Sequence, residues 1–256
     1  MKALKYIYRA LISLFPGAVQ SFLSDLYFCI CTPKLLRARA SYQYSDEHKK
    51  FVHIMEAMNY LRVAGAAGRV LPQNYFEFGC HSARTFSAAV NASIYLGMNS
   101  QFYAFDSFEG LPEIDKEQDG YFQTGTFCTS LKEFLRIVRA NTGLKLPNFT
   151  VVKGFYCDSL TTQLQARMPM AGVVYIDVDL YSSTIEVLNF LKPLLVSGTL
   201  LIFDDWYCFP PEDLGMGERR ALTEFLKANS EFAVEPWRAY STFGQSFFVI
   251  KSPNIF

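Results

Sequence analysis

Two short apolar segments of the chain each end in a pair of aspartates, and these carboxylates are the residues best suited to chemistry. Residues 173–179 read VVYIDVD, and residues 200–205 read LLIFDD. Apolar runs of this kind are typical of parallel strands buried on both faces, and ligands bind beyond the carboxyl ends of such strands. We therefore expect four side chains to converge at one edge of a sheet: Asp177, Asp179, Asp204 and Asp205.

Carboxylates gathered in this way require protonation or a cation. Two like charges ~4 Å apart repel each other by about 4 kcal/mol at an effective dielectric constant near 20. A set of oxygen ligands favours Mg²⁺ or a similar divalent cation over zinc. On an extended chain, Asp177 and Asp179 would share one face of the strand. A plainer interpretation is that one or two of the aspartates only cap the helices that follow.

A tight turn nearer the N-terminus could hold a second ligand. A predicted strand over residues 75–78 leads into Gly79, and a helix is expected from about Phe86 to Tyr95. This arrangement points backbone amides at a ligand, although an ordinary strand–helix connection is the alternative. A dinucleotide fingerprint would carry three glycines here, so bound pyrophosphate is not expected. The next strand, residues 101–105, ends at Asp106, where a carboxylate can accept hydrogen bonds from ribose hydroxyls.

The rest of the chain continues to alternate strands and helices, which predicts an α/β fold with a doubly wound, seven-stranded, mostly parallel sheet. Further strands are expected over residues 149–152, 173–176, 199–203, 232–234 and 246–250. The last two are joined by a short turn region and can be antiparallel. Further helices are expected over residues 45–65, 131–140 and 218–228, and a capping box at Ser183 and Glu186 should begin another. In the first of these helices, Lys49 and Lys50 fall on the solvated side. We divide the chain into an N-terminal helical extension, residues 1–68, and a main domain, residues 69–256.

Composition excludes some classes of protein. The 256 residues include 24 basic and 24 acidic side chains, so the basic excess of a nucleic-acid-binding protein is missing. The six cysteines are scattered, which favours free thiols and a cytoplasmic location. Residues 1–40 hold no uninterrupted apolar span of the ~20 residues that a transmembrane helix needs. That segment could contact a second subunit of a homo-oligomer or lie on a membrane surface, so membrane association is possible.

Four segments resemble the class I S-adenosylmethionine-dependent methyltransferases, and within them the macrocin O-methyltransferase (TylF-like) family. They are FEFG at 76–79, YAFDSFEGLP at 103–112, IDVDLYSST at 176–184 and FDDW at 203–206. The resemblance implies a Rossmann-like fold and a cofactor pocket for S-adenosylmethionine. The residues expected to form that pocket are Glu77, Gly79, Cys80, Ser82, Asp106, Ser107, Phe108, Gly154, Asp158, Ser159 and Asp177.

The resemblance also implies the reaction. A divalent cation, commonly Mg²⁺, would be held by Asp177, Asp204 and Asp205, with Asp179 as general base and Asp177 as a second catalytic carboxylate. The expected activity is O-methylation of a hydroxyl on a small molecule, with a sugar, a glycosylated compound or a polysaccharide as the expected acceptor. Residues 113–130 and 206–217 would then form the lids that select the acceptor.

Two other functions fit part of the pattern. A metal-dependent glycosyltransferase could use Asp177 and Asp179 to hold a nucleotide diphosphate, but it would leave Glu77, Gly79 and Asp106 without a role. A catalytically inactive binding protein of the same fold is the other alternative, although clustered carboxylates reduce stability and are not needed in a dead site.

Overall fold

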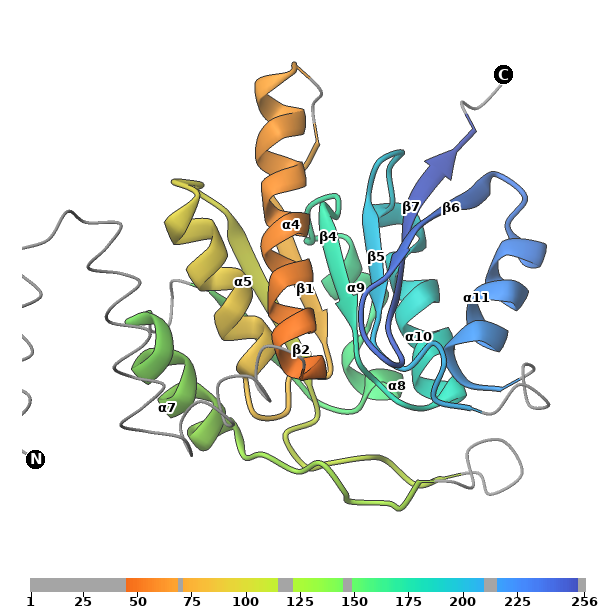
Figure 1. Ribbon diagram of the computed structural model, residues 1–256. Coiled ribbons are helices and arrows are strands. Elements are labelled where there is room, and N and C mark those ends of the chain that lie inside the picture. Colours follow the sequence, from red (N-terminus) through yellow and green to blue (C-terminus); the bar gives the residue numbers. More distant parts are fainter. Residues whose placement is uncertain (1–44, 69–70, 115–121, 145–148, 210–215, 253–256) are drawn as a thin grey trace, which may run out of the picture. The chain divides into compact units, whose positions relative to one another are not determined.

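The computed structural model describes residues 45–68, 71–114, 122–144, 149–209 and 216–252 (Figure 1). Contacts divide the chain into two units, Met1–Lys49 and Lys50–Phe256, and the fold described here is that of the second. The predicted membrane or subunit contacts of residues 1–40 lie outside the described residues, and the domain division at residue 68 stays a prediction. No described helix is both long enough and apolar enough to cross a membrane.

A single seven-stranded sheet forms the centre of this unit, with strand order β3-β2-β1-β4-β5-β7-β6. The first five strands are parallel, and β7 is antiparallel to both of its neighbours. The fold class predicted from the sequence is therefore confirmed. The strands are β1 (Asn74–Phe78), β2 (Gln101–Asp106), β3 (Thr150–Lys153), β4 (Val173–Ile176), β5 (Leu200–Phe203), β6 (Phe232–Ala239) and β7 (Gln245–Lys251).

Helices cover both faces of the sheet (Figure 1). On one face lie α4 (Asp46–Ala66), α5 (Arg84–Tyr95) and α7 (Leu131–Thr142). On the other lie α10 (Tyr181–Leu191) and α11 (Gly217–Ala228), with the short helices α8 (Tyr156–Ser159) and α9 (Thr162–Gln165) and the 3-10 turn η1 (Lys192–Leu194). The result is three layers, helix on sheet on helix.

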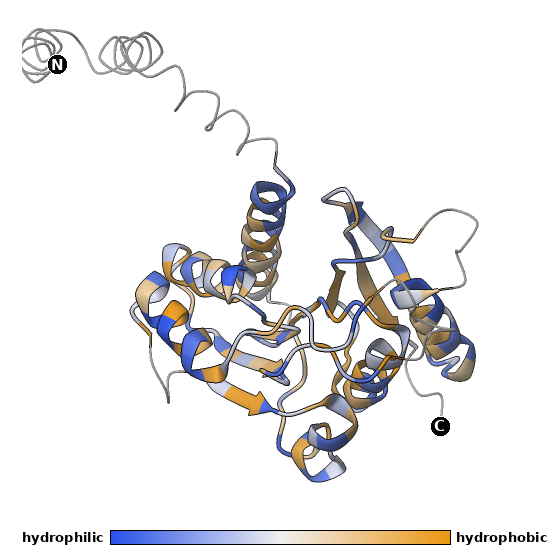
Figure 2. Cartoon of the chain, turned by 90° about the horizontal axis from the view of Figure 1, so that it is seen from below, coloured by the Kyte–Doolittle hydropathy of each residue, from blue (hydrophilic) through white to orange (hydrophobic). Residues whose placement is uncertain are grey.

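The alternation of side chains along each strand divides the core into two clusters. Tyr75 and Tyr175 face α4 and α5, whereas their neighbours Phe76 and Val174 face the opposite layer. Each large apolar side chain buried in this way contributes about 1.5–3 kcal/mol. In Figure 2 hydrophobic residues predominate on the strands, whereas the helices carry both hydrophilic and hydrophobic residues. Both faces of the central strands are buried, which explains their continuous apolar sequence.

The chain after β4 differs from the prediction in two ways. It does not stay extended, because Asp179 has a φ of 60° and the amide of Leu180 donates to the carbonyl of Val178 at 2.6 Å. Helix α10 therefore begins at Tyr181, and its N-cap, Leu180, offers no side-chain cap. The predicted capping box was wrong, because Ser183 lies buried inside the first turn of the helix.

Candidate active site

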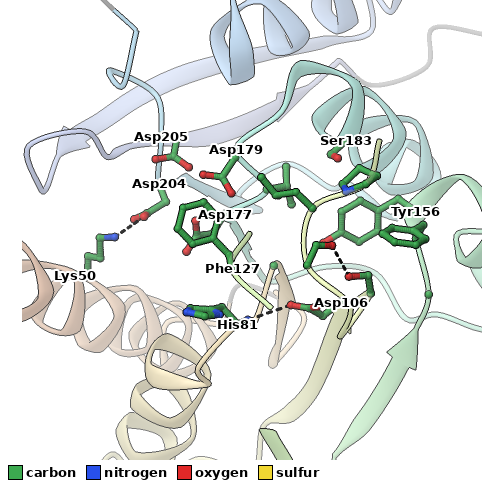
Figure 3. A pocket seen from close by; sticks show the side chains of 18 residues that line it. Lys50, His81, Asp106, Phe127, Tyr156, Asp177, Asp179, Ser183, Asp204 and Asp205 are labelled. Atoms are coloured by element: carbon green, nitrogen blue, oxygen red, sulfur yellow. Dashed lines mark hydrogen bonds and ion pairs between the residues drawn. The ribbon is translucent and has the colours of Figure 1, made fainter. Parts of the chain in front are cut away.

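A cavity of about 320 Å³ opens at the carboxyl edge of the parallel strands (Figure 3). We refer to its two ends as the glycine end, formed by Gly79, Asp106, Ser107 and Gly154, and the acidic end, formed by Lys50, Asp177, Asp179, Asp204 and Asp205. Its other lining residues are His81, Gly110, Leu111, Pro112, Phe127, Phe155, Tyr156, Val178 and Ser183. The four aspartates expected to converge therefore share one cavity with the predicted turn after β1.

Gly79 is required at the point where the two ends meet. Its φ is +79°, and a Cβ added there would lie 1.7 Å from the carbonyl oxygen of Asp177. The amide of Gly79 donates to Phe105 at 3.0 Å, and the amide of Asp177 donates to Phe78 at 2.9 Å. The tips of β1, β2 and β4 are thus joined by backbone contacts that leave no space for a side chain at residue 79.

Asp106 organises the turn at the glycine end through its two carboxylate oxygens. Its Oδ2 accepts hydrogen bonds from the amides of Cys80, at 2.7 Å, and His81, at 3.0 Å, and its Oδ1 accepts one from the amide of Phe108, at 2.6 Å. A carboxylate offers about four acceptor positions, so about one remains on Oδ1 for a ligand hydroxyl. Asp106 fixes the turn and can still face the cavity.

Three carboxylates of the acidic end form a group that could hold a metal ion. One oxygen from each of Asp177, Asp204 and Asp205 lies within 4.8 Å of the other two. Oδ2 of Asp205 is buried without a hydrogen-bond partner among the described residues. In contrast, Oδ1 of Asp204 accepts hydrogen bonds from the hydroxyls of Tyr175, at 2.6 Å, and Tyr240, at 3.0 Å.

The electrostatics of the acidic end favour neutralisation. Burial raises the pKa of Asp177 well above its usual range, and the charges of Asp204 and Asp205 raise it further. Burial likewise raises the pKa of Asp205, with the charge of Asp179 as the next cause. Burial raises the pKa of Asp179 to about 6. Burial and neighbouring negative charges both disfavour the ionised form of a carboxyl group. Carboxyl groups whose pKa is raised in this way are common at functional sites.

Lys50 supplies a positive charge at the acidic end, and here the prediction of a solvated lysine was wrong. Its ammonium group donates to Oδ2 of Asp204, and its side chain is only 27% exposed. Burial by itself lowers the pKa of Lys50, but the negative charges of Asp204 and Asp177 outweigh burial and raise it. Helical periodicity placed Lys50 on the polar face of α4, and no signal in the sequence revealed that this part of the helix faces Asp204.

Some predicted cofactor residues do not line the cavity. Glu77 is fully buried on β1 and accepts hydrogen bonds from the hydroxyls of Tyr75, at 2.5 Å, and Thr85, at 2.9 Å. Burial raises the pKa of Glu77 to about 8. The other predicted residues outside the lining are Cys80, Ser82, Phe108, Asp158 and Ser159. Their roles toward a cofactor stay predictions.

The cavity also includes residues that no sequence motif indicated. His81 follows Gly79 in the turn, and its Nδ1 lies 3.0 Å from the hydroxyl of Thr129. Phe127 has a φ of 58° and is 54% exposed although it lines the cavity. A bulky residue in this conformation is an outlier and often marks a functional position. Phe127 lies in the first predicted lid, whose residues 115–121 are outside the described residues, as are residues 210–215 of the second.

The sheet order and the cavity at its carboxyl edge define the fold of a class I methyltransferase. The solved O-methyltransferase NovP has the same fold, with a TM-score of 0.63 at 21% identity over 80% of each chain. The macrocin-O-methyltransferase (TylF) family matches residues 81–230, which is more than half of the chain. The chain therefore belongs to this family, and the predicted resemblance is confirmed.

Two curated relatives match a shorter region. A Streptomyces olivaceus protein named 8-demethyl-8-(2,3-dimethoxy-alpha-L-rhamnosyl)-tetracenomycin-C 4'-O-methyltransferase is 32% identical over 111 residues, or 40% of each chain. Demethyldecarbamoylnovobiocin O-methyltransferase of Streptomyces niveus is 30% identical over 125 residues, or 45% of each chain. The match thus spans less than half the length of these relatives.

Proposed function

We propose that this protein is an S-adenosylmethionine-dependent O-methyltransferase that acts on a hydroxyl of a sugar or a glycosylated small molecule. The observation that carries the proposal is the single cavity shared by the Gly79 turn, Asp106 and four aspartates. Membership of the macrocin-O-methyltransferase (TylF) family supports the reaction. The rhamnosyl group in the name of the Streptomyces olivaceus relative supports a sugar acceptor.

The glycine end fits the methyl donor. The turn at Gly79 leaves backbone free of side chains at the tip of β1, and Asp106 keeps about one acceptor position for a ribose hydroxyl. Ser107 and Gly154 complete this end of the cavity, and Tyr156 is a further lining residue of the same cavity. S-adenosylmethionine would supply a methyl group carried on a sulfonium.

The acidic end fits a divalent cation. Asp177, Asp204 and Asp205 supply only oxygen ligands, as Mg²⁺ prefers. Oδ2 of Asp205, which has no hydrogen-bond partner in the described part of the chain, is available as one of them. A cation held there would lower the pKa of a hydroxyl bound to it. The proposal therefore includes a requirement for Mg²⁺ or a similar ion.

The acceptor would lie between these two ends. Asp179 lines the cavity beside the other aspartates and is the carboxylate that we propose takes the proton from the acceptor hydroxyl. The exposed ring of Phe127 offers an apolar face on which a sugar ring can pack. Holding the hydroxyl in line with the methyl donor could contribute about 7 kcal/mol or more to lowering the barrier.

The direct test is turnover with a panel of nucleotide sugars and glycosylated small molecules, followed by mass spectrometry of S-adenosylhomocysteine and of methylated products. We expect methylation of at least one sugar hydroxyl, loss of activity in excess EDTA, and loss of activity in Asp179→Asn. Full activity in EDTA would remove the cation from the proposal while leaving methyl transfer intact. Release of a nucleotide diphosphate instead of S-adenosylhomocysteine would favour the glycosyltransferase alternative.

The inactive binding protein is the remaining alternative. Binding of S-adenosylhomocysteine measured by calorimetry, without turnover of any acceptor class, would favour it. The retained group of four aspartates argues against loss of activity, because buried like charges reduce the stability of the folded state.

A further inference from the structure

Lys50 is the single lysine or arginine among the described residues that line the cavity. It lies on α4 and reaches Asp204, which is 154 residues further along the chain. Figure 3 shows its side chain pointing at Asp204, on the side away from Asp179. The family match covers residues 81–230, so Lys50 lies outside the matched region and Asp204 lies within it.

Asp204 has no unused oxygen in this arrangement. Its Oδ2 is engaged by Lys50, and its Oδ1 is engaged by the hydroxyls of Tyr175 and Tyr240. The side chain of Asp204 is only 6% exposed, so water contributes little to solvating it. A cation that binds Asp204 on the side of Oδ2 therefore meets the ammonium group of Lys50 on the same oxygen.

Two positive charges on one buried carboxylate oxygen repel each other strongly. The ammonium group and a divalent cation therefore exclude each other from Oδ2 of Asp204. A lysine side chain has a flexible stem, and that of Lys50 is partly exposed. The ammonium group can therefore move toward solvent while Tyr175 and Tyr240 keep their hydrogen bonds to Asp204.

We propose that Lys50 is the resident counter-ion of the acidic end and competes with a divalent cation for Asp204. Without the cation, Lys50 holds Asp204 in position and offsets part of the charge of the four aspartates. When the cation binds, Lys50 leaves Oδ2 and Asp204 becomes a metal ligand. This inference rests on the cation of the proposed function, and it makes Lys50 a positioning residue that sets how tightly the cation is bound.

The test is calorimetric titration of the full-length protein with Mn²⁺, which needs no acceptor and no turnover. We expect Lys50→Met to bind Mn²⁺ about ten-fold or more tightly than the wild type, because the competing charge is gone. Lys50→Arg, which keeps the charge, should bind Mn²⁺ much as the wild type does. Lys49→Met is the matched control, because Lys49 is exposed and pairs with Asp46 on the same helix at 3.1 Å. It should leave Mn²⁺ affinity unchanged.

Thermal unfolding provides a second measurement. Lys50→Met should unfold at a lower temperature than the wild type in EDTA, and Mn²⁺ should raise its midpoint by more than it raises that of the wild type. Lys50→Gln, which keeps a donor for Asp204 without the charge, replaces Lys50→Met if the latter does not fold. Equal or weaker Mn²⁺ binding by the neutral variants would overturn the competition while leaving the cation site in place. Absence of Mn²⁺ binding in every variant would overturn both.

Discussion

The glycine end of the cavity is held in place by main-chain amides and the one carboxylate that binds them, whereas the acidic end is defined by contacts between charged side chains. At the glycine end, Asp106 binds three amides of neighbouring turns, and Gly79 touches Asp177 through the main chain. At the acidic end, Lys50 reaches Asp204 from α4, and the four aspartates follow β4 and β5. We therefore expect the glycine end to depend on shape and the acidic end on charge.

The largest effect that the comparison predicts is loss of turnover when charge is removed from the acidic end. Asp204→Asn keeps the shape of the side chain but removes its charge and one acceptor oxygen. We expect methyl transfer to fall by about 10³-fold or more, which corresponds to about 4 kcal/mol. The affinity for S-adenosylhomocysteine, measured by calorimetry, should change by about two-fold at most because the glycine end is intact.

The matched control for this variant is Glu235→Gln, an exposed carboxylate on β6. It carries the same loss of charge away from the cavity and should keep wild-type turnover. If Asp204→Asn were as active as Glu235→Gln, charge at the acidic end would not be what the reaction depends on.

A Cβ at the glycine end should instead reduce the stability of the fold. Gly79→Ala brings a methyl group against the carbonyl of Asp177 at a φ of +79°, so we expect a loss of about 3 kcal/mol in the free energy of unfolding. Urea denaturation measures this loss. Gly97→Ala has a similar φ of +65° but nothing within 4 Å, and should lose only about 1 kcal/mol. Equal losses in the two variants would show that close approach to β4 is unimportant.

A buried histidine next to the acidic end, His53, should make the stability of the fold depend on pH. The buried ring of His53 stacks on Tyr240 at 4.3 Å, and Tyr240 donates to Asp204. Burial, helped by the charge of Arg238, lowers the pKa of His53 from 6.5 to about 3. Because the folded state holds this histidine neutral, its contribution is complete above pH 6.5 and is lost as pH falls toward 3.

His53→Phe should remove this loss. Between pH 6 and 5 the difference between wild type and variant should change by about 1 kcal/mol, as measured by urea denaturation at each pH. Parallel stability curves for the two proteins would contradict a neutral, buried His53.

The last effect concerns the acceptor, which we propose lies between the two ends. Phe127→Ala should raise the KM for the sugar acceptor about ten-fold, the loss of one aromatic contact, and leave the KM for S-adenosylmethionine unchanged. Phe243→Ala removes an aromatic ring of similar exposure, 45% against 54%, that does not line the cavity, and should change neither constant. An equal effect of both variants would exclude a specific role for Phe127.

The sequence predicted the central strands to within about a residue because they are buried on both faces and bounded by glycine or aspartate. It predicted β6 too short, as residues 232–234 instead of Phe232–Ala239. This strand lies at the edge of the sheet, where Glu235, Pro236 and Arg238 interrupt any apolar pattern. Edge strands face solvent and tolerate such residues, so their sequence carries a weaker signal.

The amino-acid sequence by itself determined the family, the order of strands and helices along the chain, and the convergence of the aspartates. Each of these follows from local patterns: short motifs, apolar runs, and the residues at the end of each strand. Only the tertiary structure decided that Lys50 joins Asp204, that Glu77 is buried and does not line the cavity, and that Asp179 leaves the extended conformation. The physical reason is that helical periodicity defines which side of a helix is polar, but the packing of that helix on the sheet defines what its polar side meets.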